Sequence, residues 1–221
     1  KTNLTVNNAQ YVKNNANPVV HWGGRITGLL NLNDDWSITP QLTYQVLDAK
    51  GDMTYIPRFG DLVNHEFSTP ENKDRWALAA LTVQGDIGIG DIVYNASYMS
   101  RHTQTDNDYA YYTVYYDSQP GYTKFPLANG TFLDPTQQYH QWGMQREMSQ
   151  EIRYVSPKTN RWHLTTGAFY QFQRNDNYGN YYIPGISTVP GINSASGIRP
   201  VWADDVYLTW SFNRQIGRAH V

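Results

Sequence analysis

Hydrophobic and polar residues alternate along several stretches of the chain, most clearly over residues 36–46. The even-numbered positions there are all apolar or aromatic, and the odd-numbered positions are all Ser, Thr or Gln. A strand with one apolar face requires this period of two, and a helix cannot use it. Six further segments show the pattern less clearly, at residues 20–32, 75–86, 92–101, 148–157, 162–173 and 206–212. The sequence therefore predicts an all-β fold of about seven strands.

The connections between these strands alternate strictly between short and long. The short ones, residues 33–35, 87–91 and 157–160, carry Asn, Asp, Gly and Pro, which favour tight turns. The long ones cover residues 48–74, 103–147 and 175–203, and loops of that length are uncommon in a compact domain. This order predicts an antiparallel, up-and-down transmembrane β-barrel, here incomplete, with short periplasmic turns and long extracellular loops.

Aromatic residues gather near the ends of the predicted strands. Trp36 and Trp162 directly follow short turns, while Trp22 and Trp76 open strands that descend from long connections. Girdles at two membrane interfaces have this distribution, although the core of a soluble sandwich could also contain such aromatics. We expect the apolar parity of each strand to face lipid and the other parity to line a wet lumen. The predicted lumen-facing residues are Arg25, Thr43, Gln45, Glu151, Arg153, Gln171 and Gln173.

The composition is that of a polar chain, and the predicted barrel explains why a membrane protein can have such a composition. Of the 221 residues, 40% are hydrophobic and 16% are charged, and the mean hydropathy is −0.62. Half of each barrel strand faces a wet lumen and the loops are polar, so a negative mean is expected. The chain has no cysteine, which excludes a disulfide framework and thiolate metal sites. Its net charge of −2 gives no basic footprint for nucleic acid.

No motif for catalysis or for a cofactor stands out. The six histidines are scattered without the spacing of a zinc motif. Residues 106–108, Asp-Asn-Asp, have an EF-hand-like spacing but lack the required glycine and distal glutamate, which leaves a calcium site in that loop open. We predict no catalytic residue, no metal site and no cofactor, and hence a protein that is not an enzyme.

Tyrosine is concentrated in two of the long connections. Five of the eight residues 109–116 are tyrosine, and a second group lies among the asparagines near residue 178. A tyrosine ring offers an apolar face and a hydroxyl, which suits contact with sugars or aromatic chelators, although loops that pack on each other or on lipopolysaccharide also use it. The predicted ligand-binding residues are Tyr109, Tyr111, Tyr112, Tyr115, Tyr116, Tyr178, Tyr181 and Tyr182.

Several segments have the form of strands known from one protein family. Gln-Glu-Ile-Arg at residues 150–153 leads through a short turn to Trp162 and to Gly-Ala-Phe-Tyr at residues 167–170. Gly-Gly-Arg at residues 23–25 and the strand at residues 36–45 come earlier in the chain. Together these segments resemble strands of the barrel of TonB-dependent outer-membrane receptors of the sphingomonad and caulobacter type, in which a hairpin like that of residues 150–170 is frequent. The resemblance covers nearly all of residues 20–212. It implies TonB-coupled uptake of a scarce, bulky nutrient, such as a siderophore, cobalamin or a saccharide, in a Gram-negative outer membrane.

The family also has a TonB box, an N-terminal plug domain and a final strand that ends in an aromatic residue, and none of these is visible here. A plugged transporter barrel has about 22 strands, roughly three times the number predicted. We therefore expect residues 1–214 to be an interior piece of such a barrel. It would contact outer-membrane lipid, lipopolysaccharide and an unidentified small-molecule ligand, and the TonB complex only through the missing plug. Alone it would have two open edges, and would aggregate or fail to insert.

Residues 215–221 break the strand pattern abruptly and can be back-translated as a common sequencing-adapter read. We expect them to be a non-native tail outside the fold. The main alternative for the whole chain is a soluble, secreted β-sandwich that binds carbohydrate through aromatic loops, and a secreted glycosidase is a third class. A sandwich predicts connections of similar length at both ends, which the alternation of short and long connections opposes.

Overall fold

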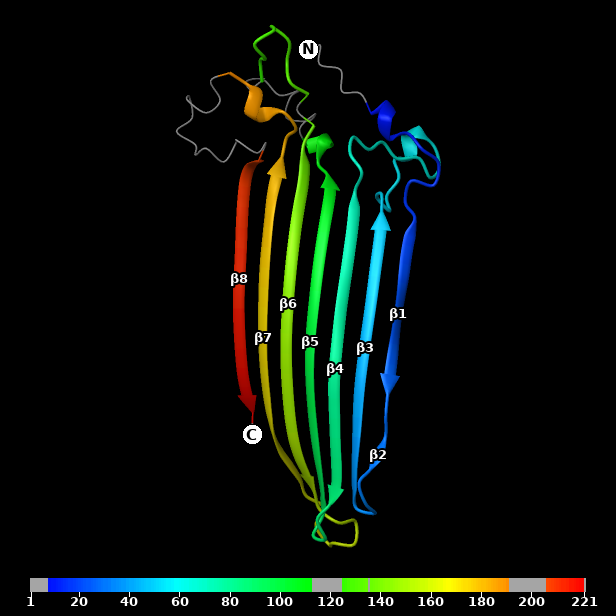
Figure 1. Ribbon diagram of the computed structural model, residues 1–221, viewed down its shortest axis with the longest axis vertical. Coiled ribbons are helices and arrows are strands. Elements are labelled where there is room, and N and C mark those ends of the chain that lie inside the picture. The colour runs from blue at the N-terminus through cyan, green and yellow to red at the C-terminus, as the bar shows by residue number, and fades with distance from the viewer. Residues whose placement is uncertain (1–7, 113–124, 135, 191–205, 221) are drawn as a thin grey trace.

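The computed structural model describes residues 8–112, 125–134, 136–190 and 206–220, and its strands form a single sheet (Figure 1). The strands are β1 (Val19–Thr27), β2 (Leu30–Asn31), β3 (Trp36–Lys50), β4 (Glu71–Asp86), β5 (Asp91–Asp108), β6 (Gln138–Val155), β7 (Thr165–Tyr182) and β8 (Val206–His220). Three one-turn 3₁₀ helices lie outside the strands, at Ala9–Tyr11, Pro57–Phe59 and Ile186–Thr188. No helix in the described part of the chain is long and apolar enough to cross a bilayer.

The strands pair in the order in which they follow one another along the chain. The order is β1-β3-β4-β5-β6-β7-β8, and β2 pairs with β3 as a continuation of the β1 arm. Every pair is antiparallel. The predicted all-β, antiparallel, up-and-down arrangement is therefore confirmed. If β1 and β2 are counted as one interrupted strand, they and the six long strands give the predicted number of about seven strands. β1 and β8 lie at opposite edges, so the sheet is open (Figure 1).

The described part of the chain has no hydrophobic core beneath this sheet. The accessible surface is 15101 Å², whereas a compact folded protein of 25.4 kDa exposes about 10,300 Å². The buried apolar side chains are Val46 and four residues near the long connections: Ala110, Ile183, Ile186 and Val189. The two broad faces of the sheet are therefore open over most of their length.

The short turns form for local reasons that the sequence already contains. The Asn33 side-chain oxygen accepts the backbone N–H groups of Asp35 at 2.9 Å and Trp36 at 2.8 Å. In the next turn, the Asp86 carboxylate accepts the Gly88 N–H at 2.7 Å, and Gly88 has a φ of +79° that glycine adopts without strain. These turns join the strands at one end of the sheet, and the long connections lie at the other, which we call the upper end (Figure 1).

Three strands extend further than the alternation predicted. β5, β6 and β7 have 18 residues each, and they include residues 103–108, 138–147 and 175–182, which the sequence placed in loops. Those segments are rich in polar residues on both faces, so alternation cannot reveal them. Backbone pairing continues to their ends and stabilises them as strands. The long connections accordingly shorten to residues 51–70, 109–137 and 183–205.

Other boundaries also differ from the expectation, and β3, which ends at Lys50, and β4, which begins at Glu71, both extend into the connection predicted at residues 48–74. β8 continues through residues 215–220, which we expected to lie outside the strand pattern, and these residues pair with β7. β7 begins at Thr165, so Trp162 lies in the turn before it and is 81% exposed. A period of two identifies the middle of a strand but not its ends, because the end is set by where the partner strand stops pairing.

Candidate functional site

The register of the sheet sorts its side chains onto two faces, because directly paired residues in an antiparallel sheet point to the same side. Trp36 stands opposite Gly85, and their row continues through Ile92 and Tyr154. We call the face with Trp36 the apolar face and the face with Ser37 the polar face. The polar face carries all seven residues that were predicted to share one side: Arg25, Thr43, Gln45, Glu151, Arg153, Gln171 and Gln173.

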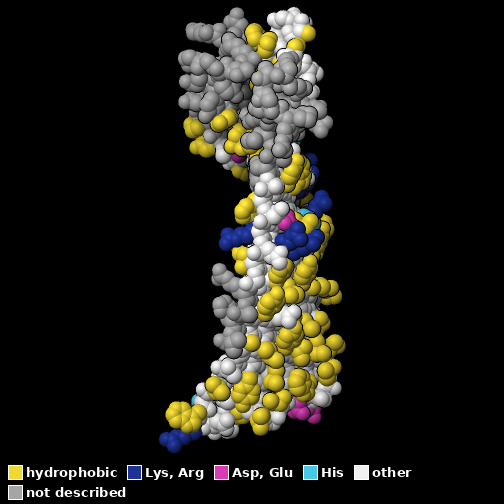
Figure 2. Space-filling model, turned by 90° about the vertical axis from the view of Figure 1, so that its left-hand side faces the viewer, with side chains coloured by type: hydrophobic (Ala, Val, Ile, Leu, Met, Phe, Trp, Pro, Cys, Tyr) yellow, Lys and Arg dark blue, Asp and Glu magenta, His cyan; other side chains and the backbone are white. Residues whose placement is uncertain are grey.

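The lower half of the apolar face carries no charge between β3 and β7. Four successive rows cross these five strands, and we call their positions the apolar band. The band consists of Trp36, Ile38, Pro40, Leu42, Ala79, Leu81, Val83, Gly85, Ile92, Tyr94, Ala96, Tyr98, Met148, Gln150, Ile152, Tyr154, Thr166, Ala168, Tyr170 and Phe172. Figure 2 shows hydrophobic side chains gathered on this side of the sheet over its lower half. Its exposed members include Leu42, Leu81, Tyr98, Ile152 and Tyr170.

The upper edge of this apolar surface is inclined to the strands. The surface that continues upward from the band ends at Val20, Val46, Ala77, Tyr98, Met148 and Phe172 on successive strands, and Met144, Trp142 and Tyr178 lie separately above it. Val20 stands opposite Asp48, whereas Tyr98, Met148 and Phe172 share the row of Leu42, so the edge falls six residues of β3 between β1 and β5 and is level from β5 to β7. With about 3.3 Å per residue and about 4.8 Å between strands, the slope averaged over all five strand-to-strand steps is about 40°.

Two aromatic residues lie on the face opposite to the predicted one. Trp76 pairs with Gln45 on the polar face, while other residues of β4 belong to the apolar band. Phe212 pairs with Asn177, also on the polar face, after a register shift between β7 and β8 at Tyr181. Because a slip of one residue exchanges the two faces of a strand, the alternation within β8 could not determine which way Phe212 points.

On the polar face, side chains from neighbouring strands bind one another. Arg101 and Asp74 form a bidentate ion pair, with the Arg101 Nε 2.9 Å from one carboxylate oxygen of Asp74 and a terminal guanidinium nitrogen 2.6 Å from the other. The hydroxyls of Ser97 and Ser149, which stand directly opposite each other, are 2.8 Å apart. These groups are only partly buried, and the face suits contact with water rather than a dry core.

Three tyrosines meet at the upper end of the polar face. The ring centroid of Tyr181 lies 5.4 Å from that of Tyr109 and 4.9 Å from that of Tyr139, and Tyr109 and Tyr139 are 5.9 Å apart. We call these three the tyrosine cluster. Tyr139 was missed by sequence reasoning because it lies alone in a segment read as loop, and only its pairing with Tyr181 brings it to the site.

The other predicted tyrosines divide between different places. The assignment of Tyr178, Tyr181 and Tyr182 to a loop was wrong, because all three belong to β7, and Tyr178 and Tyr182 lie on the apolar face. Tyr112 contacts the cluster, with its ring 5.7 Å from that of Tyr109, and Tyr111 lies beside it in the connection after β5. Burial raises the pKa of Tyr111. The two remaining residues, Tyr115 and Tyr116, lie outside the described residues.

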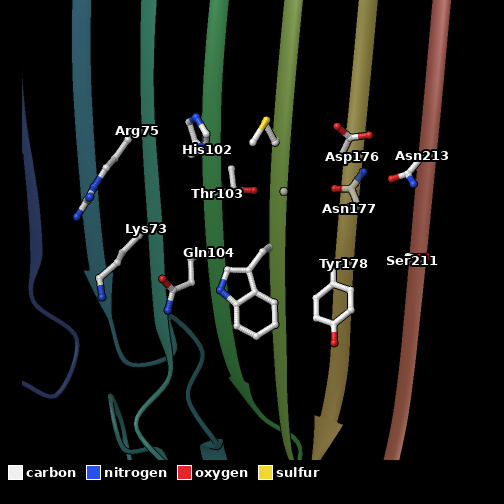
Figure 3. Close-up of a pocket in the computed structure, with 13 residues that line it drawn as sticks. Lys73, Arg75, His102, Thr103, Gln104, Asp176, Asn177, Tyr178, Ser211 and Asn213 are labelled. Carbon is white, nitrogen blue, oxygen red and sulfur yellow. The ribbon is translucent and has the colours of Figure 1, made fainter.

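A hollow of about 590 Å³ lies on the apolar face, above the apolar band. Figure 3 shows Lys73 of β4 on one side of it and Tyr178 of β7 on the other. Trp142 of β6, which also lines the hollow, has its ring 5.6 Å from that of Tyr178, with 34° between the planes. Both rings are exposed, at 39% for Trp142 and 44% for Tyr178. The hollow therefore combines a basic side with an aromatic side.

Carboxylates connect the first long connection to the upper end of the sheet. The Asp108 carboxylate accepts the backbone N–H groups of Phe67, of Ser68 at 2.9 Å and of Ala110 at 2.8 Å. Ser68 and Ala110 are buried. Asp108 therefore joins residues 51–70 to the beginning of the next connection.

Glu66 organises the same connection from within. Its carboxylate accepts the backbone N–H of Asp52 at 2.8 Å and the amide of Asn64 at 3.2 Å. Burial raises the pKa of Glu66, and the nearby charges of Asp52 and Asp108 add to the rise, although the hydrogen bond from Asp52 opposes it. No three His, Asp or Glu residues of the described segments are grouped so that they could hold a metal ion.

Neither a protein-family model, nor a curated protein, nor a solved structure matches this chain. The resemblance to TonB-dependent receptors stays a prediction. Function is therefore inferred from the two faces of the sheet, the tyrosine cluster and the hollow, which side chains from several strands build together.

Proposed function

We propose that this chain forms part of the wall of a transmembrane β-barrel, within a receptor that imports a bulky nutrient across the outer membrane of a Gram-negative bacterium. The apolar band carries this proposal, because it is an uncharged and largely open surface on a sheet without a core. Removing apolar surface from water is favourable by about 25 cal/mol per Å². A bilayer would cover the band on one side and leave the polar face to a wet lumen.

The inclined edge of the apolar surface supports the same function. Strands of membrane barrels tilt by about 35–45° from the barrel axis, so a flat membrane boundary crosses them at that slope. The observed slope of about 40° follows from the register. Along β3, the apolar positions from Trp36 to Val46 extend about 33 Å, or about 25 Å after tilting, which is the height of the apolar band of outer-membrane barrels.

The polar face and the long connections support the receptor part of the proposal. In such a barrel the polar face lines the interior, and the tyrosine cluster lies at the outer end of that lining. The three rings of the cluster are half-buried, and tyrosine rings offer stacking surfaces and hydroxyls to a saccharide or an aromatic chelator. The resemblance to TonB-dependent receptors implies the same direction of transport, driven by the TonB complex.

The alternative of a carbohydrate-binding β-sandwich has less support. A sandwich needs two sheets whose apolar faces pack against each other about 10 Å apart. All strands of the described residues belong to one sheet, and nothing among those residues covers its apolar face.

Single-cysteine labelling tests the membrane part of the proposal, because the chain has no cysteine of its own. The variants Leu81→Cys and Val83→Cys place a fluorophore on the apolar face, and Thr82→Cys and Gln84→Cys place it on the polar face of the same strand. Each would be measured in maltoside micelles that contain a spin-labelled fatty acid, since a micelle can cover an open sheet. We expect strong quenching at positions 81 and 83 and weak quenching at positions 82 and 84. Equal quenching at both parities would refute the proposal.

The ligand role is tested separately in the complete receptor. Substituting Tyr109, Tyr139 and Tyr181 together by Phe keeps the rings and removes the hydroxyls, whereas substitution by Ala removes both. Loss of ligand affinity and uptake in the Ala variant, with a smaller loss in the Phe variant, is the expected result. If both variants bind and import as the unmodified receptor does, the tyrosine cluster has no part in ligand capture.

A further inference from the structure

Arginine follows directly above the apolar surface on three strands of the apolar face. The residue next above Ala77 on β4 is Arg75, that above Met148 on β6 is Arg146, and that above Phe172 on β7 is Arg174. All three arginines are exposed, and all three side chains leave the sheet on the apolar face. If the strands tilt as proposed, the three arginines lie within about 4 Å of one another in height, because Arg146 and Arg174 share a row and Arg75 lies two residues higher on β4. They would form a basic belt at the outer boundary of the bilayer, together with His102 of β5.

Within the described part of the protein, a carboxylate pairs with only one of the three arginines of the belt. Arg146 and Arg174 stand directly opposite each other on neighbouring strands, an arrangement in which like charges are destabilising. Arg174 has an ion pair with Asp176 at 2.8 Å, but within the described residues neither Arg75 nor Arg146 contacts a carboxylate. An anion that bridges adjacent guanidinium groups would remove this repulsion, and phosphate oxygens match the fork of an arginine.

The hollow above the belt adds an aromatic surface. Trp142 and Tyr178 lie four residues above the arginines of their own strands, about 13 Å along the strand or about 10 Å in height after tilting. Paired aromatic faces of this kind suit the apolar faces of sugar rings. Apolar band, basic belt and aromatic pair thus follow one another upward along the same face.

We propose that this face binds a phosphorylated glycolipid of the outer leaflet. This inference rests on the proposed function, since it needs the apolar face to contact lipid. The acyl chains lie against the apolar band, the phosphate groups lie between Arg75, Arg146 and Arg174, and the sugars that extend outward beyond the phosphates lie on Trp142 and Tyr178. A glycerophospholipid would satisfy the arginines but has no sugar ring for the aromatic pair. The order of apolar band, basic belt and aromatic pair along this face therefore favours a glycolipid.

The test is a titration of the chain with bisphosphorylated lipid A that carries its core sugars, in amine-oxide micelles that contain neither phosphate nor sugar. Lipid A without core sugars and phosphatidylglycerol are the comparison lipids. Binding would be followed by thermophoresis for the unmodified chain and three variants. Arg146→Gln with Arg174→Gln removes two charges of the belt, and Trp142→Ala removes the aromatic contact. Arg25→Gln with Arg153→Gln is the matched control, since it removes the same charge from the polar face.

We expect the belt variant to bind lipid A about thirty-fold more weakly, which corresponds to about 2 kcal/mol for two basic groups at an anionic lipid surface. Trp142→Ala should weaken binding of the lipid that carries core sugars but not of lipid A without them or of phosphatidylglycerol, and the control should bind as the unmodified chain does. Unchanged lipid A binding in the belt variant would overturn the proposal. The proposal would also be overturned if phosphatidylglycerol bound as tightly as lipid A and its binding fell by the same factor in the belt variant. If the cysteine labels still alternate in that case, the proposed barrel stands and only the glycolipid site is lost.

Discussion

Substituting Asp108 by Ala should release the first long connection from the sheet without unfolding the sheet. The carboxylate of Asp108 accepts three backbone N–H groups, and two of them belong to the buried residues Ser68 and Ala110. A buried N–H that loses its partner costs about 1–3 kcal/mol. Two such groups give about 2–6 kcal/mol, and about 3 kcal/mol within that range is roughly a hundredfold change in the equilibrium between docked and released connection.

Hydrogen exchange of residues 51–70, followed by mass spectrometry of the chain in micelles, measures this equilibrium. Exchange should accelerate roughly a hundredfold in Asp108→Ala and less in Asp108→Asn, whose amide oxygen still accepts one or two of the bonds. Asp61→Ala is the control, because Asp61 is an exposed residue of the same connection without a described hydrogen bond. Exchange in β4 and β5 should not change. If Asp108→Ala and Asp61→Ala exchange alike, Asp108 does not hold the connection.

Further outcomes follow from other contacts. A Cβ at Gly85 would overlap the Trp36 ring, so Gly85→Ala should lower the free energy of unfolding in micelles by about 1–3 kcal/mol. Gly24→Ala, where a Cβ meets nothing within 4 Å, should cost far less, and equal losses would contradict the packing. The raised pKa of Glu66 stabilises the docked connection below pH 4.5, and this contribution is lost as the pH rises through the raised pKa. Protection of residues 52–68 should fall over that range, and Glu66→Gln should abolish the dependence. Without detergent, light scattering should show aggregation through the open edges and the apolar band.

The sequence predicted the architecture well wherever one face of a strand is apolar. Residues 36–46 have a strict period of two, and their strand, its faces and the turn before it all agree with the prediction. Prediction was weaker where both faces have similar chemistry. On β4, Trp76 and Leu81 have opposite parities, and only pairing with β3 shows which of them faces the polar side. Alternation within a strand divides its residues into two sets, but only the pairing with the neighbouring strand shows which set lies on the apolar face of the sheet.

The sequence indicated two of the three tyrosines of the cluster but not their geometry. Clustering of tyrosine indicated the upper end of the sheet, and Tyr109 and Tyr181 do meet there. Tyr139 could not be predicted, because it joins the cluster only by pairing with Tyr181, which lies 42 residues further along the chain. The basic belt could not be predicted from the sequence either. Arg75 and Arg146 are separated by 71 positions, and they come to lie along the same edge of the apolar surface only because β5 pairs with both β4 and β6.

The polar extensions of β5, β6 and β7 explain why one sheet can serve both proposals. Each continues ten residues beyond the edge of the apolar surface, from Tyr98 to Asp108 on β5 and by the same number on its two neighbours. Ten residues extend about 33 Å, or about 25 Å in height for strands tilted by about 40°. In the proposed barrel the belt lies low on this extension, at the depth of lipid phosphates, and the aromatic pair lies six residues above the edge of the apolar surface, at the depth of sugars. The tyrosine cluster lies at its top, so a ligand can reach it above the glycolipid layer. A wall that ended at the membrane boundary would place the same tyrosines among the lipid headgroups, where a bulky solute has no access.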